Sequence, residues 1–181
     1  MEIRRATAED LAAIVHLDAR VLPGHDVIPV GVFAGWAAAD PDAFQVVEVG
    51  GRVVGYLAVL ALAPGALACF EAGEIDERAL GPGDVLGPEA AREARTVYFF
   101  SVARDPAHPE IGRALVAAAE ACWRGGARFP RVERVLATAA TVAGRRMLLR
   151  LGFELRMEAD RRLDGHALFE LRLPRSADVV H

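Results

Sequence analysis

The chain has 181 residues, of which 53% are hydrophobic and 25% charged, a balance that suits one soluble domain with a sizeable core and argues against disorder. Its formal net charge of −4 provides no basic surface for nucleic acid or an anionic membrane, so we expect neither as a partner. The sequence contains no Lys, which excludes lysine Schiff-base chemistry.

The first half of the chain predicts a strand, two helices and two further strands, at residues 2–5, 7–21, 30–39, 44–49 and 52–62. Thr7 followed by Asp10 is a capping pattern for the start of the first helix, and Pro23 and Gly24 are expected to end it. Between the last two strands, Gly50 and Gly51 predict a two-residue turn in which both residues take positive φ, a strong hairpin signal.

An irregular insertion follows the hairpin at residues 63–95, rich in Gly and Pro, with a helix expected near residues 65–72. It carries an acidic cluster of Glu71, Glu74, Asp76, Glu77 and Asp84. Such a cluster attracts an amine in some proteins and is only a hydrated face in others, and the sequence leaves both interpretations open.

The second half predicts a strand, a helix, a strand, a helix and a strand pair, at residues 97–102, 110–124, 132–138, 142–151, 153–158 and 166–173. Asp164 and Gly165 are expected to make the final turn. Strands that alternate with helices before a terminal strand pair predict one α/β domain, residues 1–181, with a mixed sheet flanked by helices.

Metal, disulfide and membrane roles have little support in the sequence. Cys69 and Cys122 are far apart with no C-x-x-C pattern, and no two His residues have the spacing of helical metal ligands, so we expect no metal. Residues 53–70 lack charge over about the length of a membrane span, but Gly55 and Pro64 interrupt them and favour strand, turn and helix. The N-terminal MEIRR has no signal-peptide core, so we expect a cytoplasmic location; a homodimer stays open.

Two stretches carry a resemblance to a known superfamily. Residues 96–116, TVYFFSVARDPAHPEIGRALV, run from an apolar strand through a Pro-rich turn into an amphipathic helix, and residues 148–153, LLRLGF, end a later helix on Gly152. With the order of elements over nearly the full chain, they resemble the GNAT acyltransferases, which move an acetyl group from acetyl-CoA to an amine. The resemblance implies a GNAT-like fold, acetyl-CoA as the cofactor and a small amine as the substrate.

The cofactor loop of that superfamily, V-x-P-x-x-[RQ]-x-x-G-x-[GA], binds the CoA pyrophosphate through backbone N–H groups at a helix N-terminus. Here its Pro, Arg or Gln, and central Gly positions are Arg104, Ala107 and Glu110. A carboxylate beside the phosphate would weaken binding by about tens to a hundredfold. An ordinary helix start, with Pro109 first and Glu110 in the first turn, explains the same residues equally well. If the site survives, the residues that the resemblance assigns to CoA are Val102, Arg104, His108, Gly112, Arg113 and Thr141.

The resemblance also assigns proton transfer, and here the chain departs from the family again. Many GNAT enzymes have a Tyr that returns a proton to the CoA thiolate, at the position of Leu148, which has no proton to give. Tyr98 or Tyr56 would then have to substitute from a strand, although core packing is the simpler role for either. For the general base the candidate is Glu48, and Ser101 is expected close to the acetyl carbonyl; the plain alternatives are a solvent-facing residue for Glu48 and a backbone-bonded hydroxyl for Ser101.

Two hypotheses follow. The first is an acetyl-CoA-dependent N-acyltransferase in which the amine attacks the thioester directly and the N–H of Val102 polarises its carbonyl. The second is a catalytically silent GNAT-fold protein that binds a ligand or a partner chain, which the changes at Ala107, Glu110 and Leu148 favour. The resemblance further predicts that the central strand at 97–102 parts from the strand at 132–138 to admit the pantetheine arm, and that residues 63–95 form a flap over the acceptor side of the sheet.

Overall fold

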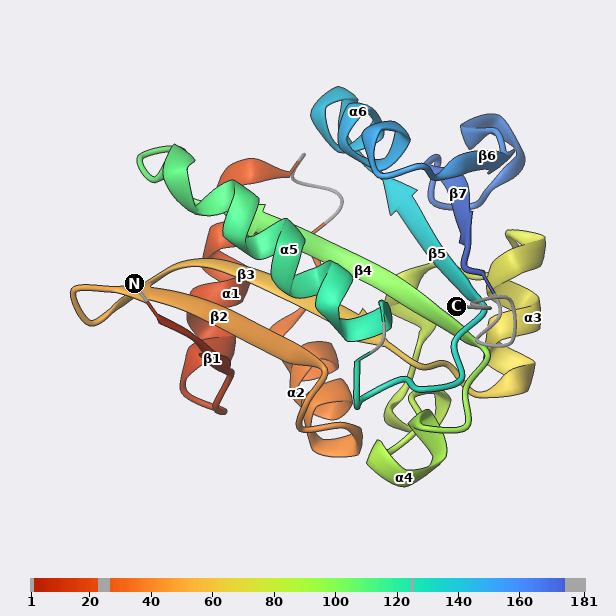
Figure 1. Ribbon diagram of the computed structural model, residues 1–181, viewed down its shortest axis with the longest axis horizontal. Helices are drawn as coiled ribbons and strands as arrows, with labels where there is room; N and C mark the ends of the chain where they lie inside the picture. The colour runs from red at the N-terminus through yellow and green to blue at the C-terminus, as the bar shows by residue number, and fades with distance from the viewer. Residues whose placement is uncertain (1, 23–26, 125, 175–181) are drawn as a thin grey trace, which may run out of the picture.

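The computed structural model describes residues 2–22, 27–124 and 126–174, so Pro23 and Gly24 lie outside the described residues. One seven-stranded sheet has the order β1-β2-β3-β4-β5-β7-β6, with helices on both faces (Figure 1). The strands are β1 (Glu2–Arg5), β2 (Phe44–Val49), β3 (Arg52–Leu60), β4 (Thr96–Arg104), β5 (Arg134–Ala139), β6 (Glu154–Met157) and β7 (Ala167–Arg172). The helices are α1 (Asp10–Val21), α2 (Val30–Ala39), α3 (Pro64–Ala72), α4 (Pro88–Ala91), α5 (Gly112–Trp123) and α6 (Val142–Arg150).

Each predicted strand and helix is present, with ends close to those expected. The hairpin turn is confirmed, because Gly50 and Gly51 have φ of 58° and 77°. The capping pattern at Thr7 and Asp10 is present only in part. The Thr7 hydroxyl does not accept a capping bond from the helix; it donates to the Asp10 carboxylate, as does the Thr7 N–H, at 2.9 and 2.7 Å. The final turn is confirmed at Asp164 and Gly165, because the Gly165 N–H donates to the Arg162 carbonyl at 3.2 Å and Gly165 has a φ of 70°; a 3₁₀ turn at Ala159–Arg161 precedes it.

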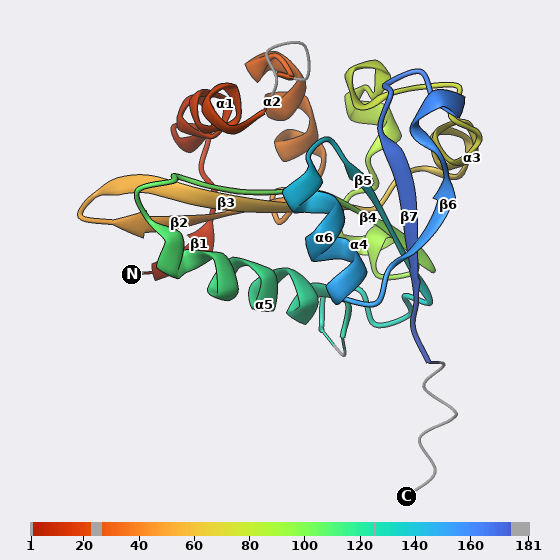
Figure 2. The same cartoon turned by 90° about the horizontal axis from the view of Figure 1, so that it is seen from above.

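The sheet separates two apolar cores. Helices α1 and α2 cover one face of the sheet, and α5 lies on the opposite face (Figure 2). The core under α1 and α2 contains Ile14, Phe33 and Trp36, all fully buried, and the core under α5 contains Ile111 and Leu115. Burial on both faces explains why β3 and β4 read as nearly continuous apolar runs rather than as alternating strands.

The two central parallel strands pair over only part of their length. Residues Thr96 to Phe99 of β4 are in register with Arg134 to Ala137 of β5, and β4 then continues to Arg104 while the last residues of β5 pair with β7 alone. Figure 1 shows β4 and β5 diverging beyond this point. The predicted parting of these strands, with β4 central, is therefore confirmed.

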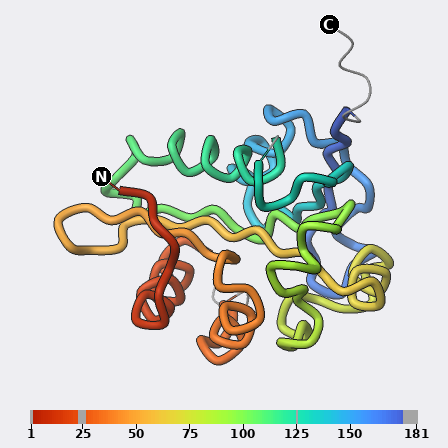
Figure 3. The backbone as a smooth tube through the Cα atoms, turned by 60° about the horizontal axis from the view of Figure 1, so that its bottom comes forward, coloured from red at the N-terminus to blue at the C-terminus, as the bar shows by residue number. Residues whose placement is uncertain are grey.

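The insertion at residues 63–95 is packed into the domain. Figure 3 shows most of it on the same side of the sheet as α1 and α2. Its side chains Phe70, Leu80 and Val85 are buried in that core, and the Trp36 indole N–H donates to the Leu80 carbonyl at 2.9 Å. The insertion is thus anchored in the core that it covers, and it is packed more firmly than the predicted flap.

Candidate functional site

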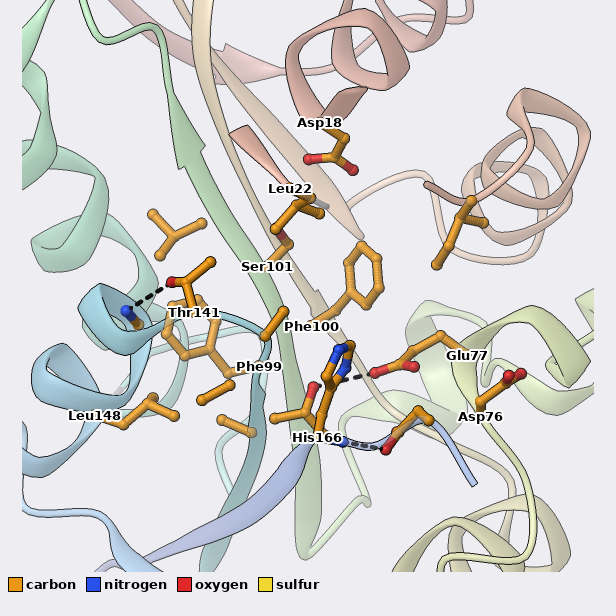
Figure 4. A pocket seen from close by; sticks show the side chains of 18 of the residues that line it. Asp18, Leu22, Asp76, Glu77, Phe99, Phe100, Ser101, Thr141, Leu148 and His166 are labelled. Carbon is orange, nitrogen blue, oxygen red and sulfur yellow. Dashed lines mark hydrogen bonds between the residues drawn. The ribbon is translucent and has the colours of Figure 1, made fainter. Parts of the chain in front are cut away.

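A pocket of about 130 Å³ lies where β4 and β5 part (Figure 4). Its walls come from α1, the insertion, β4, the end of β5, α6 and the segment before β7. The polar residues that line it are Asp18, Asp76, Glu77, Arg78, Ser101, Thr138, Thr141, Asp164 and His166. Residues that are distant in the sequence therefore meet at one place, which is set by the divergence of the two strands.

The backbone of Val102 faces this gap. The Asp105 N–H donates to the Val54 carbonyl at 2.7 Å, so these two residues form a hydrogen-bonded pair, and the register from there is continuous to Leu57 opposite Val102. Since hydrogen-bonded and non-bonded pairs alternate in an antiparallel ladder, the N–H and C=O of Val102 point away from β3. They point toward the side that β5 has left, where an extended ligand arm can pair with them.

A β-bulge determines the direction of Ser101. Val59 pairs with Phe99 and Ala58 with Ser101, so Phe100 is an extra residue on β4. Strict alternation would place Ser101 on the same face as Phe99, which packs in the α5 core. The extra residue places it on the face of α1 instead, as its contact there requires.

Ser101 belongs to a buried hydrogen-bonded chain. Its hydroxyl oxygen lies 2.9 Å from that of Tyr56, and the Tyr56 hydroxyl lies 2.7 and 2.8 Å from the two carboxylate oxygens of Asp18. Asp18 is only 1% exposed. Burial raises its pKa to about 6, and the hydrogen bond from Tyr56 offsets part of that rise. The Tyr56 pKa is raised well above its usual value by burial and by the Asp18 charge, so the phenol keeps its proton and donates it.

A second carboxylate approaches the pocket from the insertion. Glu77 accepts a short hydrogen bond from the Tyr98 hydroxyl, and Thr138 Oγ1 lies 3.1 Å from Glu77 Oε1 and 2.8 Å from the Tyr98 oxygen. Glu77 and Thr138 line the pocket, whereas Tyr98 lies behind them. Burial and the charge of Glu77 raise the Tyr98 pKa well above its usual value. Tyr98, our candidate proton donor, therefore contacts Glu77 rather than the pocket.

The loop after β4 is closed by its own residues. The Asp105 carboxylate accepts the Ala107 N–H at 2.9 Å and two hydrogen bonds from Arg20 at 2.9 and 3.1 Å. The His108 N–H donates to the Asp105 carbonyl at 2.9 Å. Two of the amides that such a loop would turn toward a phosphate are therefore already used.

The start of the next helix is likewise occupied. The Glu110 carboxylate accepts hydrogen bonds from its own backbone N–H and from His108 Nδ1, which together hold its pKa below the usual value. The Arg104 side chain lies over Gly112, where a Cβ would stand 3.4 Å from Arg104 Nε. These residues and the exposed Arg113 do not line the pocket. Of the predicted cofactor residues, the pocket brings together only Val102 and Thr141.

Of the remaining predicted residues, some line the pocket and others do not. Thr141 lines the pocket and caps α6, because its hydroxyl accepts the Gly144 N–H at 3.0 Å. Leu148 also lines the pocket and is buried. Glu48 does not line it; its carboxylate accepts two hydrogen bonds from Arg4, at 2.8 and 3.1 Å, beside β1. The structure thus separates Glu48 from Ser101, with which the sequence grouped it.

The sequence reasoning missed Asp18, although a signal for it exists. Leu11, Ile14 and Asp18 have the i, i+3, i+7 spacing of one helix face, so a carboxylate occupies a core position. Among the described residues no group of three or more His, Cys, Asp or Glu side chains could hold a metal ion. In the same part of the chain, none of the helices has the length and apolar character needed to cross a membrane.

Known proteins resemble this chain in structure. No protein-family model matches it, and no curated protein does. The GphF GNAT-like decarboxylase in complex with isobutyryl-CoA is 18% identical over 96% of this chain and 100% of its own, with a TM-score of 0.70. Ard1 from Thermoplasma volcanium is 15% identical over 96% and 98%, with a TM-score of 0.65.

A third similar structure is diaminobutyrate acetyltransferase EctA from Paenibacillus lautus, in complex with L-2,4-diaminobutyric acid and coenzyme A. It is 17% identical over 94% of this chain and 93% of its own, with a TM-score of 0.60. All three structures align with nearly the whole chain at low sequence identity. They share with this chain the arrangement of the mixed sheet and its helices. The chain therefore has the fold of the GNAT superfamily.

Proposed function

We propose that the protein is an acetyl-CoA-dependent N-acyltransferase that acts on a small amine. The observation that carries this proposal is the pocket at the parting of β4 and β5, where the Val102 N–H faces the gap and two buried carboxylates approach from opposite elements. The thioester carbonyl would accept a hydrogen bond from the Val102 N–H, and the neutral amine would attack the carbonyl carbon. The C–S bond would then break, and the CoA thiolate would leave and take up, from solvent, the equivalent of the proton that the nitrogen loses. Thr141 has a hydroxyl proton left to donate to the pantetheine arm.

The charge of the pocket supports an amine as the acceptor. Four carboxylates line it. Asp76 pairs with Arg78 and Asp164 pairs with the buried Arg162, so the negative charge comes chiefly from Asp18 and Glu77, which each accept hydrogen bonds from neutral phenols. A low-dielectric pocket with this excess of negative charge attracts an ammonium group and repels a carboxylate. EctA, whose structure contains a diamino acid, is one of the similar proteins, so we place small amines with a second polar group first among acceptors.

A second candidate is decarboxylation of an acyl-CoA, the activity in the name of the GphF neighbour. Leu148 favours it, because decarboxylation leaves the thioester intact and needs no proton donor for a departing thiolate. The four lining carboxylates oppose it, since the substrate would carry its own carboxylate into the pocket. The catalytically silent alternative has the same pocket without turnover, and Glu110 and Leu148 favour it.

One set of measurements separates the three. Calorimetric titration and thermal shift with acetyl-CoA report binding by mass action, whether or not turnover follows. Release of free thiol from acetyl-CoA is then assayed with ethylamine, 1,4-diaminobutane, spermidine and 2,4-diaminobutyrate, and CO₂ release with malonyl-CoA. Amine-dependent thiol release supports the proposal. Binding without thiol release supports the silent alternative, and CO₂ release supports decarboxylation. Absence of binding at millimolar acetyl-CoA refutes the proposal.

A further inference from the structure

Three side chains lead from the pocket wall into the core under α1. Ser101 lines the pocket, Tyr56 is fully buried behind it, and the chain ends at Asp18 of α1, which also borders the pocket but is only 1% exposed. Tyr56 has one proton and donates it to the Asp18 carboxylate, so the Ser101 hydroxyl must donate to Tyr56. This orientation leaves the lone pairs of Ser101 as acceptors on the pocket side.

We propose that this chain of hydroxyls transfers a proton from the acceptor's ammonium group to the Asp18 carboxylate. The inference rests on the proposed function. The ammonium N–H is donated to Ser101 Oγ, the Ser101 proton passes to Tyr56, and the Tyr56 proton passes to the carboxylate. One N–H bond breaks and one carboxyl O–H bond forms, with no change of oxidation state. The amine becomes neutral and keeps its lone pair for attack on the thioester.

The surroundings of Asp18 suit a proton acceptor. Tyr56 contacts it from β3, and Ser101 follows on β4. Across the pocket lie Glu77 and Arg78 from the insertion and His166 from the segment before β7. Asp18 is thus a carboxylate in a poorly solvated place, and it is ionised at pH 7 because burial raises its pKa only to about 6.

The proposal accounts for a feature that a structural role leaves unexplained. A carboxylate that only anchors α1 to the sheet needs a hydrogen bond to Tyr56 and nothing more. The β4 bulge adds a third member, because it moves Ser101 onto the Tyr56 face and so places a partly exposed hydroxyl in contact with the Tyr56 phenol, whereas Asp18 itself is only 1% exposed. Asp18 and Tyr56 act through Ser101 and are positioning and proton-accepting residues, whereas Ser101 contacts the amine.

The test compares Asp18→Asn, Tyr56→Phe and Ser101→Ala with the wild-type chain, using acetyl-CoA and the best amine of the panel between pH 6 and 10. At pH 7 about one alkyl amine in a thousand is neutral, and at pH 10 a large share is. We expect Asp18→Asn and Tyr56→Phe to lower kcat/KM for the amine by about a hundredfold at pH 7. Near pH 10 the loss should shrink to a few-fold, and the Kd for acetyl-CoA should stay unchanged.

Two control variants complete the design. Asp10→Asn makes the same chemical change on the same helix, outside the pocket. Any effect of this variant on kcat/KM should be the same at pH 7 and at pH 10. His166→Gln removes the pocket imidazole and should keep the pH dependence of kcat/KM that the wild-type chain shows between pH 6 and 10. A loss in Asp18→Asn that is equal at all pH values, or no loss at all, overturns the relay. If the wild-type chain turns over no amine at any pH, the proposed function fails and the relay fails with it.

Discussion

The Arg20 guanidinium donates two hydrogen bonds to the Asp105 carboxylate and so joins α1 to the loop after β4. The same carboxylate accepts the Ala107 N–H. These contacts, that of Ala107 first and that of Arg20 second, hold the Asp105 pKa below its usual value. A lowered pKa means that the contribution to loop order is present above about pH 4 and is lost as the carboxylate is protonated at lower pH.

The first prediction concerns this loop. Asp105→Ala removes both contacts, whereas Asp105→Asn keeps an acceptor for the Ala107 N–H but loses the charge and one of the two oxygens that accept from Arg20. We expect amide exchange at Ala107 to accelerate about tenfold or more in Asp105→Ala, and clearly less in Asp105→Asn. Hydrogen exchange followed by NMR makes the comparison, and wild-type rates in both variants would show that the amide does not depend on this carboxylate.

The second prediction concerns Glu110, whose carboxylate would lie beside a phosphate if the loop after β4 binds CoA. Its side chain is 62% exposed and contacts His108, so solvent and the imidazole screen part of its charge. We therefore expect Glu110→Gly to strengthen acetyl-CoA binding by about three- to tenfold, less than the charge alone implied from the sequence. Glu110→Gln is the matched control, because it removes the charge and keeps the side chain. Calorimetric titration at low and high salt measures both variants, and unchanged affinity in both would leave Glu110 as a helix cap.

The third prediction tests proton return to the thiolate. Leu148 is buried in the pocket wall, so Leu148→Tyr adds a hydroxyl there and also adds volume, which is expected to lower stability by about 1–3 kcal/mol. Turnover should rise while the Kd for acetyl-CoA stays the same. Leu148→Phe adds a similar ring without the hydroxyl and should bring no gain. Equal rates in the two variants would show that thiolate protonation does not limit turnover.

Much of the fold could be predicted because its signals are local. The Gly50 and Gly51 turn depends on two adjacent residues, and α2 ends at Asp40 as its sequence indicates. The site depends on distant contacts instead. The direction of Ser101 follows from one extra residue in the β3–β4 register. Glu48 lies on β2, two strands from β4, where it forms an ion pair with Arg4 of β1. Neither the bulge nor the ion pair has a signature within its own segment.

The fourth prediction concerns acceptor binding by the insertion. Glu77→Gln keeps an acceptor for the Tyr98 hydroxyl and removes the charge that would attract an ammonium group. We expect KM for the amine to rise about tenfold, with little change in the Kd for acetyl-CoA. Glu74→Gln, an exposed position of the same insertion, is the matched control. If both variants behave alike, the acidic insertion is a hydrated face and takes no part in substrate selection.

The last prediction compares two aspartates of α1 whose pKa values move in opposite directions. Hydrogen bonds from Arg4 lead the lowering of the Asp10 pKa to about 2. The contribution of Asp10 to stability, about 2 kcal/mol, is therefore present above about pH 4 and is lost toward pH 2. Burial raises the Asp18 pKa to about 6, so the unfolded chain ionises first and stability falls as pH rises from about 4 through 6, by about 3 kcal/mol in total.

Urea unfolding at pH 4 and pH 8 distinguishes these effects. Asp10→Asn should destabilise the protein at pH 8 by about 2 kcal/mol, because it leaves Arg4 without this partner. Asp18→Asn should stabilise it at pH 8 by about 1–2 kcal/mol, since the buried charge is gone and part of the Tyr56 hydrogen bond remains, and should bring no gain at pH 4. Destabilisation by Asp18→Asn at both pH values would show that the carboxylate serves the fold. If Asp18→Asn instead raises stability and removes turnover, the buried charge is retained for chemistry, because stability alone would favour its replacement.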